Sequence, residues 1–144
     1  MTYNPGADLA RRYPRWVLRH RPLIGGIPEV LCWRRQVILI ERHMSRSARL
    51  CAEAHAVAHL DLEHAATLRG VLEAREEHSA DLLAARRMVE VRALASTLTL
   101  DLPPADLADE LGVTSHLLTV RLNHLHPSER ALIRRHVARR EAVA

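Results

Sequence analysis

The segment that follows Ser45 constrains the fold more than any other part of the chain, because its apolar residues recur with the period of an α-helix. One apolar stripe comprises Leu50, Ala54, Val57, Ala58 and Leu62. Alanines occupy much of the remaining surface, which predicts a helix that is buried on nearly all sides, with Ser45 or Ser47 capping its start. His55 and His59 lie four residues apart in this helix, so their imidazoles project from one face about one turn apart.

The residues before this helix predict β-structure. Clusters of apolar and β-branched residues at 16–18 and 37–40 are separated by the turn formers Pro22, Gly25, Gly26 and Pro28. Residues 30–33 predict a further strand, and Arg34-Arg35 then forms a tight hairpin turn, although neither arginine favours the positive φ of such turns. We therefore expect an α+β fold, with a small antiparallel β-sheet or hairpin packed on the histidine-bearing helix.

The chain after the histidine helix predicts helices only. Gly70 marks a break, after which residues 71–94 show helical spacing, and Pro103-Pro104 ends that section. Three short amphipathic helices follow, at residues 105–111, 114–124 and 128–140. We accordingly divide the chain into a segment 1–102, built around the histidine helix, and a helical segment 103–144.

Composition limits the classes to which the chain can belong. With 144 residues, 48% hydrophobic and 26% charged, it is expected to form one compact soluble unit. No apolar run reaches the ~20 residues of a membrane helix, and the first residues lack a signal-peptide pattern, so we expect a cytoplasmic protein without a membrane partner. The arginines are scattered, so the net charge of +4 permits nucleic-acid binding without indicating it. Cys32 and Cys51 are expected to be small buried hydrophobes.

The two histidines predict a metal site. Unpaired imidazoles in a buried helix need polar partners, and a zinc ion shared by two histidines on one face is the most economical partner. A third ligand has to come from a separate segment, and Glu77 heads the run Glu-His-Ser-Ala-Asp-Leu-Leu-Ala. Glu63 and His64 are alternative ligands, but three ligands on consecutive turns of one straight helix converge poorly on one ion.

The H-x-x-x-H helix behind a small β-hairpin, followed by an E-x-x-A-D-x-x-A helix, resembles the ImmA/IrrE-type zinc metallopeptidases. The resemblance is clearest over residues 39–88 and, by the order of elements, extends over the rest of the chain. It implies that His55, His59 and Glu77 bind Zn²⁺, while Asp81 orients a ligand or its helix. It also implies a zincin-like fold and, as substrate or partner, a cytoplasmic DNA-binding regulator such as a repressor of a phage or mobile element.

The residue beside the first histidine departs from the pattern of this family. In the H-E-x-x-H motif this residue is a glutamate, the general base that takes a proton from the attacking water, and here it is Ala56. General bases contribute on the order of 10²–10⁴-fold to the rate, so we expect an inactive or nearly inactive peptidase with intact metal ligands. Glu53 points to a different side of the helix and cannot replace the base. An engineered substitution and a natural pseudopeptidase both fit this alanine.

Residues 105–124 resemble a helix-turn-helix, with a glycine turn at Gly112 and a second helix capped by Thr114. On DNA or a protein partner, the second helix would offer Ser115, His116, Thr119 and Arg121. The first helix is acidic and would repel phosphates, because it contains Asp106, Asp109 and Glu110. A DNA-binding regulator is the alternative to a metallopeptidase scaffold. The other interpretation of these helices is that they complete the core or grip a protein substrate.

Overall fold

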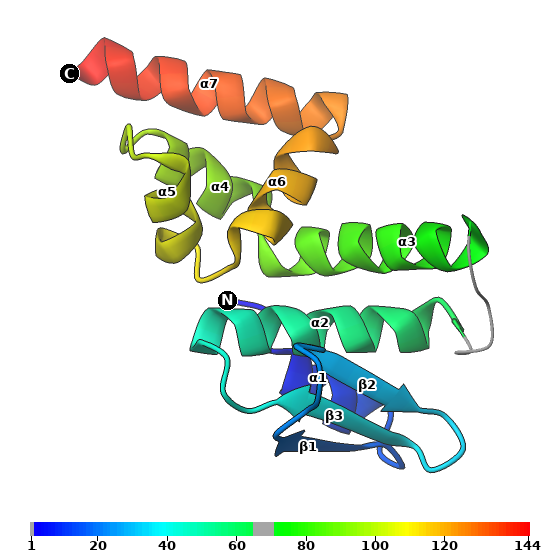
Figure 1. The fold of residues 1–144 in the computed structure, drawn as a ribbon. Coiled ribbons are helices and arrows are strands. Elements are labelled where there is room, and N and C mark those ends of the chain that lie inside the picture. Colours follow the sequence, from blue (N-terminus) through cyan, green and yellow to red (C-terminus); the bar gives the residue numbers. More distant parts are fainter. Residues whose placement is uncertain (1, 65–70) are drawn as a thin grey trace.

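The computed structural model describes residues 2–64 and 71–144, which form a small sheet and a larger helical part (Figure 1). The elements in chain order are α1 (Pro5–Arg12), β1 (Val17–Arg21), β2 (Glu29–Cys32), β3 (Val37–Glu41), α2 (Arg46–Asp61), α3 (Val71–Met88), α4 (Val91–Leu98), α5 (Pro104–Glu110), α6 (Ser115–Asn123) and α7 (Pro127–Val143). This arrangement confirms the predicted α+β class. The break predicted at Gly70 lies outside the described residues.

The sheet has the strand order β1-β3-β2, with Ile38 and Ile40 of the central strand fully buried. β2 and β3 form the predicted antiparallel hairpin, in which Cys32 pairs with Val37 across a turn at residues 33–36. The positive φ of this turn, 53°, falls on Gln36 rather than on an arginine. β1 runs parallel to β3, so the prediction of an antiparallel sheet is wrong for this pair. The connection over residues 22–28 carries β2 away from β1, and β3 fills the position between them.

α1 is a helix in a region where the sequence predicted only strands. Asn4 caps it by accepting a hydrogen bond from the backbone N–H of Ala7 at 2.9 Å, and Pro5 occupies the first helical position, where no N–H is needed. Leu9 on its inner face is buried in the smaller core cluster, which also contains Ile38 and Ile40. These local signals are short, and the eight-residue helix depends on this burial for its stability.

α2 is the buried central helix that the sequence predicted, and it lies between the sheet and α3 (Figure 1). Ser45 caps it by accepting from the N–H of Ala48 at 3.1 Å. Its residues Ala52, Ala56, Val57 and Leu60 belong to the cluster against the sheet. Other residues of α2, including Cys51, belong to the larger cluster formed with the later helices. Packing on two opposite faces explains why small apolar residues surround this helix.

The single helix predicted over residues 71–94 is interrupted, since α3 ends at Met88 and α4 begins at Val91. Val89 is buried at the break, and Glu90 is extended with ψ 139°. The Val89 carbonyl that the break leaves without a helical partner accepts a hydrogen bond from Nε of Arg121 at 2.9 Å. The larger core cluster continues from α2 through α6 to Ile133 of α7, across the predicted boundary at residue 102, and that division remains a prediction.

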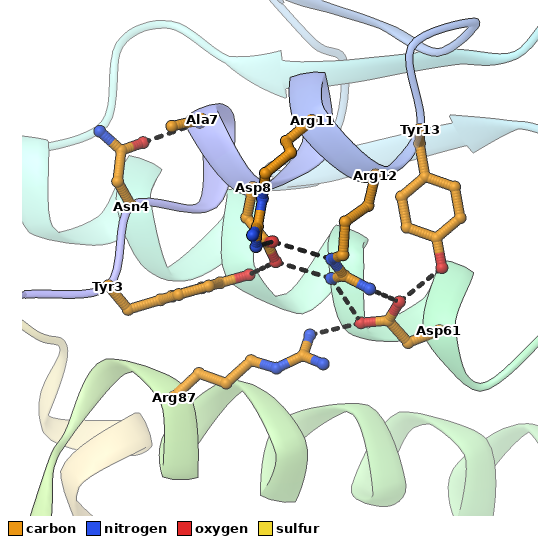
Figure 2. Close-up of polar contacts among 9 residues, drawn as sticks. All are labelled: Tyr3, Asn4, Ala7, Asp8, Arg11, Arg12, Tyr13, Asp61 and Arg87. Carbon is orange, nitrogen blue, oxygen red and sulfur yellow. Dashed lines mark hydrogen bonds and ion pairs between the residues drawn. The ribbon is translucent and has the colours of Figure 1, made fainter.

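A network of arginine and aspartate side chains joins α1, α2 and α3 (Figure 2). We call Asp8, Arg12, Asp61 and Arg87, together with Tyr13, the arginine–aspartate cluster. The Arg12 guanidinium donates to both aspartates, with Nη2 2.6 Å from Asp8 and 2.9 Å from Asp61. Tyr13 donates to Asp61, and Arg87 of α3 forms an ion pair with it. The cluster thus fixes the C-terminal end of α2, two residues beyond His59.

Within the described part of the chain, every helix is too short or too polar to cross a bilayer.

Candidate metal centre

Three side chains that the sequence singled out converge between α2 and α3. His55 and His59 belong to α2, and Glu77 belongs to α3. The two helices run side by side (Figure 1). One ligand atom from each residue lies within 4.8 Å of the other two. Nε2 of His59 is 3.1 Å from Oε1 of Glu77, and Nε2 of His55 is 3.4 Å from Oε2 of the same carboxylate. This group of two nitrogens and one carboxylate can hold a metal ion.

His55 has an orienting partner that the sequence analysis missed. Its Nδ1 lies 2.7 Å from Oε1 of Glu29, at the first position of β2. Its Nε2 is buried and has no hydrogen-bond partner among the described residues. A buried nitrogen without a partner costs free energy, whereas an imidazole whose other nitrogen is held by a carboxylate is well placed to bind a metal. The only sequence feature that could have indicated Glu29 is its position as a lone acidic residue at the start of an apolar strand, directly after Pro28.

Burial and charge give the two histidines different pKa values. Burial lowers the pKa of His59 to about 4, and the nearby His55 and His64 contribute to that shift. His59 is therefore neutral at physiological pH, which is the form that binds a metal. Burial also lowers the pKa of His55, but the hydrogen bond and the charge of Glu29 outweigh it, so the net shift is upward. The Glu29 carboxylate thus increases the basicity of the His55 ring.

The carboxylates around the histidines repel one another. Burial raises the pKa of Glu77, and the charges of Glu29 and Asp81 raise it further against the opposing effect of His55. A cation bound between these groups would relieve this repulsion. The raised pKa of Glu77 and the lack of a hydrogen bond to Nε2 of His55 among the described residues are both compatible with a metal ion at this position.

Asp81 lies beside the three candidate ligands and links them to α6. Its Oδ1 is 3.5 Å from Nε2 of His55, and its Oδ2 is 2.9 Å from Nε2 of His116. Asp81 thus lies on the side of His55 that faces Glu77, whereas Glu29 holds the other ring nitrogen, and the orienting role that the family resemblance implied for Asp81 stays a prediction. His116, predicted to contact DNA or a partner, is thereby brought to the edge of the histidine site.

The other predicted contact residues of α6 do not join the histidine site. Ser115 and Thr119 are exposed, and the Thr119 hydroxyl donates to the Ser115 carbonyl. Arg121 is only 3% exposed, and its guanidinium donates to Glu129 at 2.9 and 2.7 Å. It is therefore not displayed on the surface that DNA contact requires.

Residues considered as substitutes for the missing base lie elsewhere. Ala56 is fully buried against the sheet and places no carboxylate near the histidines. Glu53 contacts Nε2 of His20 on β1 at 2.9 Å, on another side of α2, as its spacing predicted. The alternative ligand His64 is adjacent to the site, with its Nδ1 3.1 Å from Nδ1 of His59, which places it behind the ligand nitrogen rather than with the three ligands.

Two clefts meet at the candidate metal site. One, of about 190 Å³, is lined by Glu29, Leu31, Trp33, His59, His64, Glu73, Glu76 and Glu77. The other, of about 410 Å³, is lined by Pro28, Glu29, Met44, Ala48, Cys51, Ala52, His55, Glu77, Asp81, Thr114, His116 and Leu117. Glu29 and Glu77 line both clefts, so a bound chain could pass the histidines from one cleft to the other. The first cleft is strongly acidic, and the second is mainly apolar.

Comparisons with protein-family models, with curated proteins and with solved structures find no match to the chain. The candidate metal site is therefore supported by the geometry of its residues.

Proposed function

We propose that the chain is a zinc-binding metallopeptidase scaffold that holds Zn²⁺ through His55, His59 and Glu77 and captures a protein partner without cutting it efficiently. The observation that carries the proposal is the convergence of three ligand atoms within 4.8 Å from two helices. The partner suggested by the resemblance to the ImmA/IrrE type is a cytoplasmic DNA-binding regulator.

The donor set supports zinc over harder divalent cations. Two imidazole nitrogens and one carboxylate are a common catalytic zinc set, whereas Mg²⁺ and Ca²⁺ prefer oxygen ligands. Glu29 supports the same choice, because its bond to Nδ1 of His55 leaves Nε2 directed toward Glu77. A bound zinc ion would polarise a peptide carbonyl.

The candidate ligands supply metal binding, but position 56, which holds the general base of the H-E-x-x-H motif, carries no proton acceptor. Ala56 cannot take a proton from water, and its side chain is buried in the apolar cluster against the sheet. Without this group, hydrolysis is expected to be slower by about 10²–10⁴-fold. The site retains what is needed to bind a metal and a polypeptide.

An extended polypeptide fits the surroundings of the site. β2 is an edge strand, because the sheet order places β3 on only one side of it. Glu29 at its start contacts His55, so a peptide paired with β2 would run past the candidate ligands. The acidic cleft favours basic side chains in that peptide, as in the DNA-contacting surface of a regulator.

A zinc titration tests the metal site. Metal-free protein competing with a chromogenic chelator should bind one equivalent of Zn²⁺, and His59→Ala should weaken binding by more than about 100-fold, beyond the usual effect of an orienting partner. His78→Ala is the matched control, since His78 is an exposed histidine next to Glu77. Equal affinities of the two variants would contradict the assignment.

Restoring the base tests the peptidase scaffold. Ala56→Glu is expected to cleave casein or fluorogenic peptides in the presence of zinc, while Ala56→Gln, of the same size but without the carboxylate, should not. Zinc affinity measured on both variants establishes that the site survives the larger side chain at a buried position. If both variants bind zinc and cleave at the same rate, the scaffold is not a silenced peptidase.

A further inference from the structure

A third cavity, separate from the two clefts at the histidine site, lies between α4 and α7 in the helical part of the chain. Its volume is about 520 Å³, and it is lined by Arg92, Ser96, Leu132, Arg135, His136 and Arg139. The residues from α4 are four apart, and those from α7 follow the spacing i, i+3, i+4, i+7, so each helix presents one continuous face to the cavity. The lining is thus formed by the packing of the two helices, not by a chance meeting of loops.

The lining has a net positive charge. It contains three arginines and no carboxylate, and the ion pairs of the described residues involve other arginines. Arg135 and Arg139 are four apart on α7, where like charges repel each other. Arg92 is in the first turn of α4, where the helix dipole disfavours a cation. This concentration of positive charge is unfavourable until an anion binds.

His136 provides a second, independent indication of a ligand. Its Nε2 is buried and has no hydrogen-bond partner among the described residues. Buried side-chain nitrogens normally have a partner, and those that do not call for an explanation. The exposed arginines beside it have long, flexible side chains, and their rearrangement around an anion would bring a ligand oxygen within reach of this nitrogen.

We propose that the cavity between α4 and α7 is a binding site for a small organic phosphate. Arginine forks match phosphate oxygens in pairs, and three guanidinium groups balance a dianionic phosphoryl group better than a single carboxylate. The volume exceeds that of a bare ion and falls in the range of small-molecule sites. Leu132 and the arginine stems provide apolar surface for the organic part of the ligand.

Calorimetric titration of the metal-free protein with adenosine monophosphate tests this site, with adenosine and inorganic phosphate as companion probes. Adenosine monophosphate should bind saturably, phosphate more weakly, and adenosine not at all at the same concentrations. The double variant Arg135→Ala/Arg139→Ala should weaken binding of adenosine monophosphate by roughly tenfold or more, the loss expected for charge-assisted pairs.

The matched control is Arg134→Ala/Arg140→Ala, which removes the same charge from the same helix outside the cavity. It should change the affinity by less than about twofold, because exposed charges are screened by salt. Circular dichroism and thermal melting confirm that both double variants are folded, since all four arginines are exposed. Equal losses in the two double variants, equal binding of adenosine, or no saturable binding of either phosphate probe at millimolar concentration would overturn the proposal.

Discussion

Two groups of charged side chains lie along the interface between α2 and α3, and they differ in how their charge is balanced. In the arginine–aspartate cluster, Asp61 accepts from Arg12 and Tyr13 and pairs with Arg87 (Figure 2). Burial raises the pKa of Asp61, but these partners outweigh it and hold the pKa below its usual value. The chain itself supplies every charge that this aspartate needs.

At the histidine site the carboxylates have no such partners. Glu29, Glu77 and Asp81 contact histidines, and within residues 2–64 and 71–144 no arginine pairs with them. The pKa of Glu77 is raised, in the direction opposite to Asp61. Two acidic groups on the same pair of helices thus differ, since the charge of Asp61 is balanced by arginines of the fold and Glu77 belongs to a group that could hold a metal ion.

The largest expected effect concerns the completed cluster. Asp61→Asn leaves Arg87 without its anion and Arg12 with Asp8 alone, and should lower the free energy of unfolding by about 3 kcal/mol, measured by urea denaturation. Asp109→Asn, at an exposed residue for which no ion pair is described, serves as the control and should change stability by less than about 0.5 kcal/mol.

The stability difference between the native chain and Asp61→Asn should depend on pH, because the pKa of Asp61 is lowered in the folded protein. Because the pKa of Asp61 in the folded protein lies below its ordinary value of 3.8, its stabilisation is present above that value and is lost as the pH falls through the folded pKa. The stability gap between the native chain and Asp61→Asn should therefore narrow in acid. A gap that stays constant would show that the ion pairs are not its source.

Zinc binding at the proposed site of His55, His59 and Glu77 should stabilise the protein by nearly as much as Asp61→Asn destabilises it. Free Zn²⁺ at a hundred times its dissociation constant should raise the free energy of unfolding by about 2.7 kcal/mol relative to protein in chelator. Asp61→Asn should retain this increment, and His59→Ala should lose it. Loss of the increment in both variants would mean that the two clusters are energetically coupled and not separate.

The parts of this fold that could be predicted are those encoded by short, regular spacings. The apolar stripe of α2 without its last member Leu62, which is exposed at the C-cap, the Ser45 cap and the closeness of His55 to His59 all depend on residues within a few turns of one helix. Glu77 could be added because the second motif places it on the next helix. The convergence of these three side chains agrees with what the spacing indicated.

The features that were missed depend on contacts between distant segments. Glu29 meets His55 only because β2 is an edge strand beside α2, and Arg12 meets Asp61 only because α1 exists. Arg121 looked like a surface residue because it is charged, yet Glu129 and a free backbone carbonyl allow its burial. No local pattern in the sequence encodes such pairings.

A smaller effect is expected from Glu29, whose carboxylate contacts His55. Glu29→Gln removes the charge that holds Nδ1 of His55 and should weaken zinc binding by about 10–100-fold, measured by chelator competition. Glu76→Gln is the matched control, because Glu76 lines the same acidic cleft without contacting either histidine. If both variants lose affinity equally, the general negative charge of the cleft attracts the metal and Glu29 has no specific orienting role.

The smallest expected effect is a gain in stability on replacing Glu77. It tests whether Glu77, unlike Asp61, lacks a balancing charge in the fold. In metal-free protein, Glu77→Gln removes a carboxylate that Glu29 and Asp81 repel. Because the folded pKa of Glu77 is raised, its ionisation destabilises the native chain as the pH rises above the ordinary value of 4.5. The side chain is 53% exposed, so screening limits the gain in unfolding free energy to less than about 1 kcal/mol. A loss comparable to that of Asp61→Asn would show that Glu77 is a structural anion already balanced by the fold, and the site would then need no metal.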